Sequence, residues 1–299
     1  MTLVNISAVK LRLLLVIIWC IIFLSQSQPL ALFSEYAGFS FLGVTGALFA
    51  NSTGAGGGVV FMPFFKQLGF TPMMAVATSF AIQCCGMTAG AITWWAFYRK
   101  LTQQVGHIAE QWQPLAQVLL LTVPWSILGI ALVQYNAPIF NLISEPEQLH
   151  MSFGLFSIAL AVAIFATLPL SSMVNPRTIL QGFDRLALMA IALVGGAITA
   201  WLSVGVGELV AVYLIFRRFN ITFAIACAVI LSAFSVWGAV IYHVLISQAV
   251  QWPVVLFAGA GAIVGGILAK RLVLHFSPRN LKLFFAAWIL ILGLGTLPY

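Results

Sequence analysis

The segment Asn51-Ser52-Thr53-Gly54-Ala55-Gly56-Gly57-Gly58 interrupts an apolar run that extends from residue 37 to residue 68. Glycine destabilises a helix interior by about 1 kcal/mol relative to alanine, so four glycines in this short stretch predict that the helix unwinds here. A second apolar run, 186–216, is interrupted by Ser203-Val204-Gly205-Val206-Gly207-Glu208. Inside a bilayer, unwound backbone is tolerated only where protein or a water-filled cavity surrounds it. Both breaks are therefore expected to face the protein interior.

The composition of the chain places these segments in a membrane. Of its 299 residues, 62% are hydrophobic and 6% are charged, whereas soluble domains are about 45–50% apolar and about 25% charged. Runs of about 20 apolar residues can span a bilayer. Six further runs are long enough: 72–98, 114–135, 149–170, 221–246, 253–269 and 281–297. The composition excludes a soluble domain and predicts an all-α polytopic membrane protein.

The first apolar run, Leu13–Leu24, follows the basic residues Lys10 and Arg12. Signal peptides and spanning helices share this pattern, but no small-x-small cleavage site follows it. We favour a spanning helix that extends to Phe33, so that the chain emerges on the outer side near Glu35. Whether residues 1–30 are cleaved stays open.

The distribution of basic residues predicts the topology. If each broken segment crosses the membrane once, nine of the 13 Lys and Arg residues are cytoplasmic and four are outside. If each broken segment instead returns to its own side, twelve are cytoplasmic and only Lys66 is outside. The positive-inside rule favours the second arrangement. We therefore expect seven spanning helices plus two interrupted re-entrant helical hairpins, with a cytoplasmic N-terminus; whether the hairpins cross the membrane fully stays open.

A weak internal repeat accompanies this topology. Gly46-Ala47-(x)2-Ala50 lies 150 residues before Gly196-Ala197-(x)2-Ala200, and Gly57 precedes Gly207 by the same offset. Each copy contains one hairpin and three crossings, and because three is odd the second copy is inverted. Inverted repeats with interrupted helices are typical of secondary transporters. The predicted organisation is an N-terminal transmembrane helix in 1–36, a first repeat in 37–170, a cytoplasmic linker in 171–185 and a second, inverted repeat in 186–299.

The two breaks have the chemistry of an anion site. Unwound glycine-rich backbone and helix N-termini present free N–H groups and a positive dipole end, and nearby hydroxyl groups add donors. The alternative is that the glycines only allow close helix packing. The predicted substrate-binding residues are Asn51, Ser52, Thr53, Gly54, Gly56, Gly57, Gly58, Thr78, Ser79, Ser203, Gly205, Gly207 and Ser232.

Glu208 is the acidic residue predicted to lie deepest in the membrane. Burying a carboxylate costs several kcal/mol unless it is protonated or paired. A fixed negative charge would also repel an anionic substrate. We expect Glu208 to bind a proton when the anion binds, and so to couple or gate transport. The alternative is a structural glutamate that is protonated or hydrogen-bonded, near Arg217 or Arg218.

Several other functions are not supported by the sequence. There is no Walker motif, dinucleotide-binding loop or catalytic-triad spacing, so we expect neither an enzyme nor a cofactor. The cysteines and histidines have no metal-ligand spacing. The basic residues lie in short loops, which indicates membrane orientation rather than nucleic-acid binding. The expected partners are the lipid bilayer, a small anionic substrate and a proton or sodium ion as coupling ion, for a monomer or a homodimer.

One family resemblance is visible at the first break. Gly54-x-Gly56-Gly57-Gly58, Pro63, Gly69 and Ala77-Thr78-Ser79 resemble the signature of the TauE/SafE sulfite exporter family. The duplicated layout of residues 37–297 is similar to that family as well. The second copy departs from the pattern, because Gly207-Glu208 stands where the first copy has Gly57-Gly58.

The resemblance implies a multi-pass permease of the bacterial inner membrane that exports sulfite, a sulfonate or another small organosulfur anion. Combined with the residues above, it predicts a secondary active transporter with alternating access at the two glycine-rich breaks. The alternatives are a membrane-embedded enzyme that uses Cys84 or Glu208, and a non-transporting assembly subunit.

Overall fold

The computed structural model describes residues 3–103, 107–140, 146–166, 168 and 176–296, and the elements in these ranges are helices. In chain order they are α1 Leu3–Leu24, α2 Pro29–Tyr36, α3 Phe39–Thr53, α4 Gly58–Gln67, α5 Pro72–Thr102, α6 His107–Glu110, α7 Leu115–Gln134, α8 Ala137–Phe140, α9 Pro146–Ala166, α10 Gly182–Leu202, α11 Val206–Phe216, α12 Ile221–Leu245, α13 Trp252–His275 and α14 Pro278–Thr296. The predicted all-α class is confirmed. The first third of the predicted linker 171–185, residues 171–175, lies outside the described ranges.

Five helices are long and apolar enough to cross a membrane, namely α5, α7, α10, α12 and α13. The bent pair α1 and α2 would make a sixth. The two remaining expected spans, 149–170 and 281–297, fall on α9 and α14. The apolar parts of these helices are shorter, at Met151–Ala166 and Lys282–Ile291.

The expected continuous helix from Leu13 to Phe33 is wrong, because the chain turns by 111° between α1 and α2. Four polar residues, 25–28, separate the two helices, and α2 begins with Pro29. Proline disfavours the helical conformation of the residue before it, so the turn falls where the sequence changes from apolar to polar.

The two predicted helix breaks are confirmed. Helix α3 ends at Thr53, Gly54 follows with a φ of +80°, and α4 begins at Gly58. In the second copy α10 ends at Leu202 and α11 begins at Val206, with Gly205 between them at a φ of +145°. These positive φ angles are accessible to glycine at little cost. Gly54 therefore sets where α3 stops, whereas α10 is ended by Ser203, which has a left-handed φ of +57°.

The helices that flank the breaks pack in equivalent pairs. Helix α3 lies along α13, and α10 lies along α7. Glycines allow both close approaches: an ideal Cβ at Gly43 would lie 1.9 Å from the Ala258 carbonyl oxygen, and one at Gly196 would lie 2.2 Å from that of Ser126. Helix α5 packs on α12, and α14 packs on α9. The interior of the bundle therefore mixes helices from both halves of the chain.

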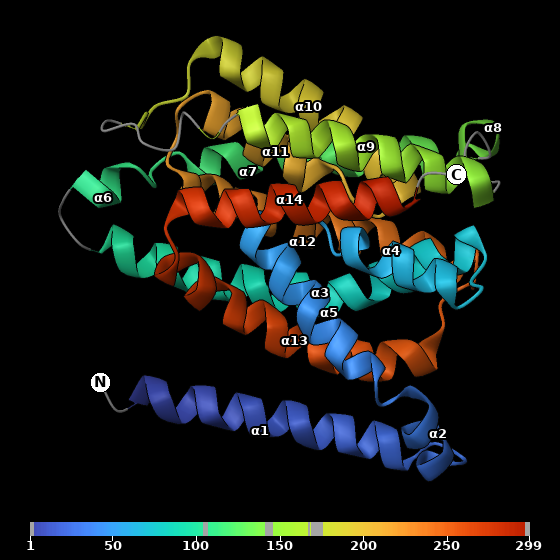
Figure 1. Ribbon diagram of the computed structural model, residues 1–299. Helices are drawn as coiled ribbons and strands as arrows, with labels where there is room; N and C mark the ends of the chain where they lie inside the picture. The colour runs from blue at the N-terminus through green and yellow to red at the C-terminus, as the bar shows by residue number, and fades with distance from the viewer. Residues whose placement is uncertain (1–2, 104–106, 141–145, 167, 169–175, 297–299) are drawn as a thin grey trace.

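Helix α1 lies beside this bundle rather than within it, as Figure 1 shows. The Trp19 indole Nε1 donates to the carbonyl oxygen of Leu256 on α13 at 2.9 Å. Most of the large apolar side chains between Leu13 and Leu24 are exposed on the surface. Helix α1 thus presents an apolar surface suited to lipid, and the two breaks lie elsewhere, among α3, α4, α10 and α11.

Candidate functional site

The two helix breaks are in direct backbone contact with each other. An ideal Cβ at Gly207 would lie 2.3 Å from the carbonyl oxygen of Gly54, and one at Gly58 would lie 2.6 Å from that of Ser203. Neither glycine can carry a side chain without backbone movement. The contact joins segments that are about 150 residues apart in the sequence.

Glu208 connects the two breaks through its carboxylate. The side chain is 4% exposed. Its Oε1 accepts a hydrogen bond from the Gly56 N–H at 2.6 Å, and its Oε2 accepts one from the Gly205 N–H at 2.9 Å. Glu208 is the third residue of α11, where an acidic side chain can reach back to the backbone that precedes the helix. One carboxylate therefore binds an N–H group from each break.

These hydrogen bonds also fit the alternative of a structural glutamate, although Arg217, which that alternative placed nearby, forms an ion pair with Asp184.

Gln83 on α5 forms a second bridge between the breaks, and sequence reasoning missed it. Its Oε1 accepts from the Gly57 N–H at 2.8 Å. Its Nε2 donates to the carbonyl oxygen of Ser203 at 3.1 Å, to the Ser203 Oγ at 2.8 Å and to the Ser79 Oγ at 3.0 Å. The sequence feature that could have indicated Gln83 is its spacing, because this amide side chain lies four residues after Ser79 and therefore on the same helix face.

Several of the N–H groups expected to be free at the breaks are bonded to side chains in this conformation. Glu208 accepts from Gly56 and Gly205, and Gln83 accepts from Gly57. The Thr199 Oγ1 accepts from the Val206 N–H at 2.9 Å. An anion that binds these donors must therefore replace a protein oxygen.

Two small cavities meet at Glu208. A buried water needs about 10–15 Å³, so the larger cavity, of about 40 Å³, has room for about three waters and the smaller, of about 10 Å³, for about one. The larger cavity is lined by Ser52, Thr53, Ala55, Leu160, Ile164, Glu208, Ala211, Val212, Ile215, Ile221, Ile225, Lys282 and Ile289. The smaller cavity is lined by Gly56, Gln83, Thr199, Ser203, Val204, Gly205, Val206, Gly207, Glu208, Ser232, Ser235 and Val236.

Most of the predicted site residues thus come together, but two of them face other neighbours. The Asn51 Nδ2 donates to the carbonyl oxygens of Ala47 at 2.8 Å and Gly86 at 3.3 Å, within the packing of α3 on α5. The Thr78 Oγ1 accepts from the N–H of Gln251, just before α13. Both side chains are fully buried, and both tie helices or loops together.

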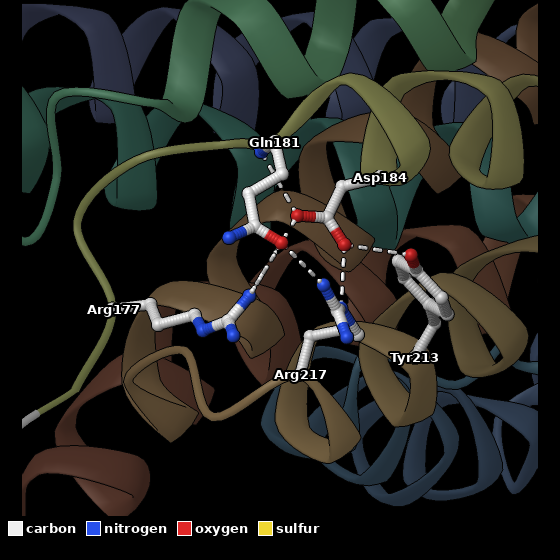
Figure 2. Close-up of polar contacts among 5 residues, drawn as sticks. All are labelled: Arg177, Gln181, Asp184, Tyr213 and Arg217. Atoms are coloured by element: carbon white, nitrogen blue, oxygen red, sulfur yellow. Dashed lines mark hydrogen bonds and ion pairs between the residues drawn. The ribbon is translucent and has the colours of Figure 1, made fainter.

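A third polar cluster closes the base of the second hairpin (Figure 2). The fully buried Asp184 accepts hydrogen bonds from the Gln181 N–H at 2.9 Å, from the Tyr213 hydroxyl at 2.8 Å and from the Arg217 Nε. The hydrogen bond to Asp184 raises the pKa of Arg217 above its ordinary value, so the guanidinium stays charged. The cluster fixes the end of α11 to the start of α10.

The backbone closes the same base. The Arg177 N–H donates to the carbonyl oxygen of Arg218 at 2.9 Å. The chain segments that enter and leave the α10–α11 hairpin therefore lie side by side.

The family described as sulfite exporter TauE/SafE matches residues 39–296, which covers both breaks and every helix from α3 to α14. No curated protein and no solved structure matches the chain.

Proposed function

Because the chain belongs to the TauE/SafE sulfite exporter family, we propose that it is a secondary active transporter that exports sulfite, a sulfonate or another small organosulfur anion. The observation that carries this proposal is the position of Glu208, whose carboxylate occupies N–H groups of both breaks. A carboxylate and a sulfur oxyanion offer the same kind of acceptor oxygen. A site that holds one has donors suited to the other.

The proposed mechanism is an exchange of anions at the breaks. A protonated Glu208 carries no negative charge and is a weaker acceptor, so it releases the N–H groups of Gly56 and Gly205. The substrate anion then takes these donors. Proton binding and anion binding therefore favour each other, and this coupling is reciprocal. The proton is the coupling ion in this proposal, with sodium as the alternative. Because proton and anion bind together they cross in the same direction, so export requires an outward substrate gradient that exceeds any inward proton gradient.

The proposed architecture is an inverted repeat with seven spans, α1, α5, α7, α9, α12, α13 and α14. The paired packing of α3 on α13 and of α10 on α7 supports two copies related by a two-fold axis. The hydrogen bond between Arg177 and Arg218 supports a second hairpin that returns to its own side. We assign the first repeat to 37–170 and the second to 186–299, with the N-terminus in the cytoplasm and the chain in a bacterial inner membrane.

The two alternative functions have less support. Members of a sulfite exporter family are transporters rather than enzymes. The thiol of Cys84, one candidate nucleophile, is buried and donates to the Val236 carbonyl oxygen at 3.6 Å. A non-transporting subunit would have no need of two interrupted helices that meet at a buried carboxylate.

Ligand-induced thermal stabilisation of the purified protein tests the substrate class. Sulfite, thiosulfate, sulfate, sulfoacetate, taurine and acetate are compared as ligands. A ligand that binds only the native state stabilises it by about 2.7 kcal/mol at a hundredfold excess over Kd. We expect stabilisation by a sulfur anion and its loss in Ser52→Ala and Thr53→Ala.

The matched control is Ser34→Ala. The exposed Ser34 hydroxyl donates to a carbonyl oxygen of its own helix, as the hydroxyls of Ser52 and Thr53 do. This variant should keep the ligand shift. Folded wild-type protein that responds to none of these anions would contradict the proposed substrate class.

A further inference from the structure

Three of the helices that can cross a membrane, α5, α7 and α12, enclose an apolar groove. Helix α12 forms the floor of this groove, and α5 and α7, which pack on α12, form its two walls. The groove has a volume of about 700 Å³. Pockets that hold small molecules have volumes of about 300–1,000 Å³, so the groove is large enough for a ligand.

The groove opens on the outer surface of the bundle. Ile92, Leu120 and Phe234, one from each of the three helices, line the groove and are 62%, 76% and 54% exposed. Apolar cavities do not retain water. In a membrane, this hollow is therefore suited to hydrocarbon chains.

The groove is about as long as one leaflet of a bilayer is thick. Its lining on α7 runs from Ala116 to Pro124, eight residues or about 12 Å along the helix, whereas half of a hydrocarbon core is about 15 Å. At the Pro124 end, the Trp237 Nε1 donates to the Thr88 Oγ1 at 2.8 Å, so the polar atoms there are paired. This end of the groove needs no polar ligand.

The other end of the groove lies where α5 ends and where α7 and α12 begin. The ring of Trp112, just before α7, is 5.4 Å from that of Phe97 on α5 and 5.9 Å from that of Phe223 on α12. Arg99 follows Phe97 by two residues and is exposed. Because Arg99 also follows the lining residue Trp95 by four residues, it lies on the face of α5 that lines the groove.

This end of the groove is electropositive. Helices α7 and α12 both present their N-terminal, positive dipole ends there. Lys100 adds a second exposed basic side chain on α5, and the Lys270 ammonium on α13 lies 5.7 Å from the centroid of the Phe97 ring. Glu110, at the end of α6, is an acidic residue close to this edge in the sequence, and the basic residues outnumber it.

We propose that the groove binds one acyl chain of an anionic phospholipid and that Arg99 binds the phosphate of its headgroup. Basic pockets between membrane helices bind anionic headgroups on the cytoplasmic side, where the topology proposed above places Arg99. Trp95, which lines the groove one turn before Arg99, has the amphipathic ring that is enriched at membrane interfaces. The proposal rests on that topology and not on the identity of the transported anion.

A second copy of the chain would fit this face less well than a lipid. Copies related by a two-fold axis bring the same face of each chain together. If this axis is perpendicular to the membrane, Arg99 of one copy meets Arg99 of the other at the same depth, and like charges repel. A lipid phosphate complements the same positive charge.

The test is native mass spectrometry of the full-length protein in detergent, titrated with phosphatidylglycerol or with phosphatidylcholine of the same acyl chains. Phosphatidylcholine has no net charge, so the comparison isolates the headgroup. Arg99→Gln removes the positive charge and Arg99→Lys keeps it, and Arg279→Gln is the control at an exposed arginine of α14. Ala116→Trp fills the mouth of the groove, and Ala159→Trp is its control at an exposed alanine of α9.

We expect the wild type to bind its first phosphatidylglycerol about fivefold more tightly than phosphatidylcholine, the effect of about one basic residue near a membrane surface. Arg99→Gln should abolish this preference, whereas Arg99→Lys and Arg279→Gln should retain it. Ala116→Trp should weaken binding of both lipids by about tenfold, because the acyl chain loses apolar contacts. Ala159→Trp should bind both lipids as the wild type does.

Equal affinity of the wild type for the two lipids, or a preference that survives in Arg99→Gln, would overturn the headgroup site. Wild-type lipid affinity in Ala116→Trp would overturn the groove as the acyl-chain site, and an altered proportion of dimers in that variant would identify a second copy as the occupant. Because Arg99→Gln changes an exposed side chain, a folding failure of Ala116→Trp leaves the headgroup test available. The titration contains no sulfur anion, so a protein that binds the lipid but transports no such anion would contradict the transport function alone.

Discussion

The Glu208 carboxylate accepts a hydrogen bond from the backbone N–H of Gly56, 152 residues earlier in the chain, at 2.6 Å. The same carboxylate holds the N–H of Gly205 in its own half. A single proton on this side chain would therefore weaken contacts in both halves at once. This makes the Glu208–Gly56 contact the natural place for a proton to control access to the breaks.

Glu208→Gln tests whether that proton matters. Glutamine keeps the size of the side chain and one acceptor oxygen, but it has no exchangeable charge. We expect sulfite transport by the wild type to slow as pH rises, because less Glu208 is protonated, and we expect the variant to lose this dependence. Initial rates in reconstituted vesicles over a range of pH measure both. An unchanged rate with an unchanged pH profile would sink the coupling hypothesis.

Gln83→Ala removes the amide that bridges Gly57 and Ser203. Leaving these buried groups without a partner should lower the free energy of unfolding by about 1–3 kcal/mol. Gln103→Ala is the control, because Gln103 is exposed just after the end of α5. Thermal unfolding of both purified variants gives the comparison, and equal melting temperatures would contradict a bridging role for Gln83.

Gly207→Ala places a methyl group only 2.3 Å from the carbonyl oxygen of Gly54, which is closer than van der Waals contact allows. Overpacking of this kind typically costs about 1–3 kcal/mol, and here it would also push the two breaks apart. We expect lower stability and loss of sulfite transport.

The matched control is Gly38→Ala, where an added Cβ would meet nothing within 4 Å. It should retain stability and transport. Transport by Gly207→Ala at the wild-type rate would show that close contact of the breaks is not required.

Asp184→Ala removes the carboxylate at the base of the second hairpin, to which Tyr213 and Arg217 donate, and leaves Arg217 with the Gln181 Oε1 as acceptor. Breaking a buried ion pair costs about 3–5 kcal/mol; the Arg217 side chain is 25% exposed, so we expect about 3 kcal/mol or less. Arg177→Ala should cost under about 1 kcal/mol, because that side chain is 37% exposed and lies 4.0 Å from Asp184. Similar losses of stability in the two variants would contradict the assigned roles.

The sequence predicts the fold class and both breaks because these features depend on local composition. Apolar content alone indicates spanning helices, and glycine density locates the two breaks, although α10 ends at Ser203 rather than at a glycine. The direction in which an individual side chain points is harder to predict from the sequence. Ser52 and Thr53 line a cavity, but Asn51, one residue earlier, turns toward α5.

For a related reason, the sequence does not predict that Gln83 and Lys282 lie beside the two breaks. A lone polar residue in an apolar helix does not reveal which neighbouring helix it faces. Lys282 follows three other basic residues, Lys270, Arg271 and Arg279, which made a surface position the simpler prediction. Its burial depends on the packing of α14 against α9, a contact between helices more than 100 residues apart.

The most direct test of the account is counterflow of radiolabelled sulfite into vesicles that contain only the purified protein and are preloaded with unlabelled sulfite. The account predicts rapid accumulation of label with the wild type and with Gly38→Ala, and none with Gly207→Ala. Folded wild-type protein that supports no counterflow of sulfite or of any other small sulfur anion would contradict the proposal that the two breaks form a transport site.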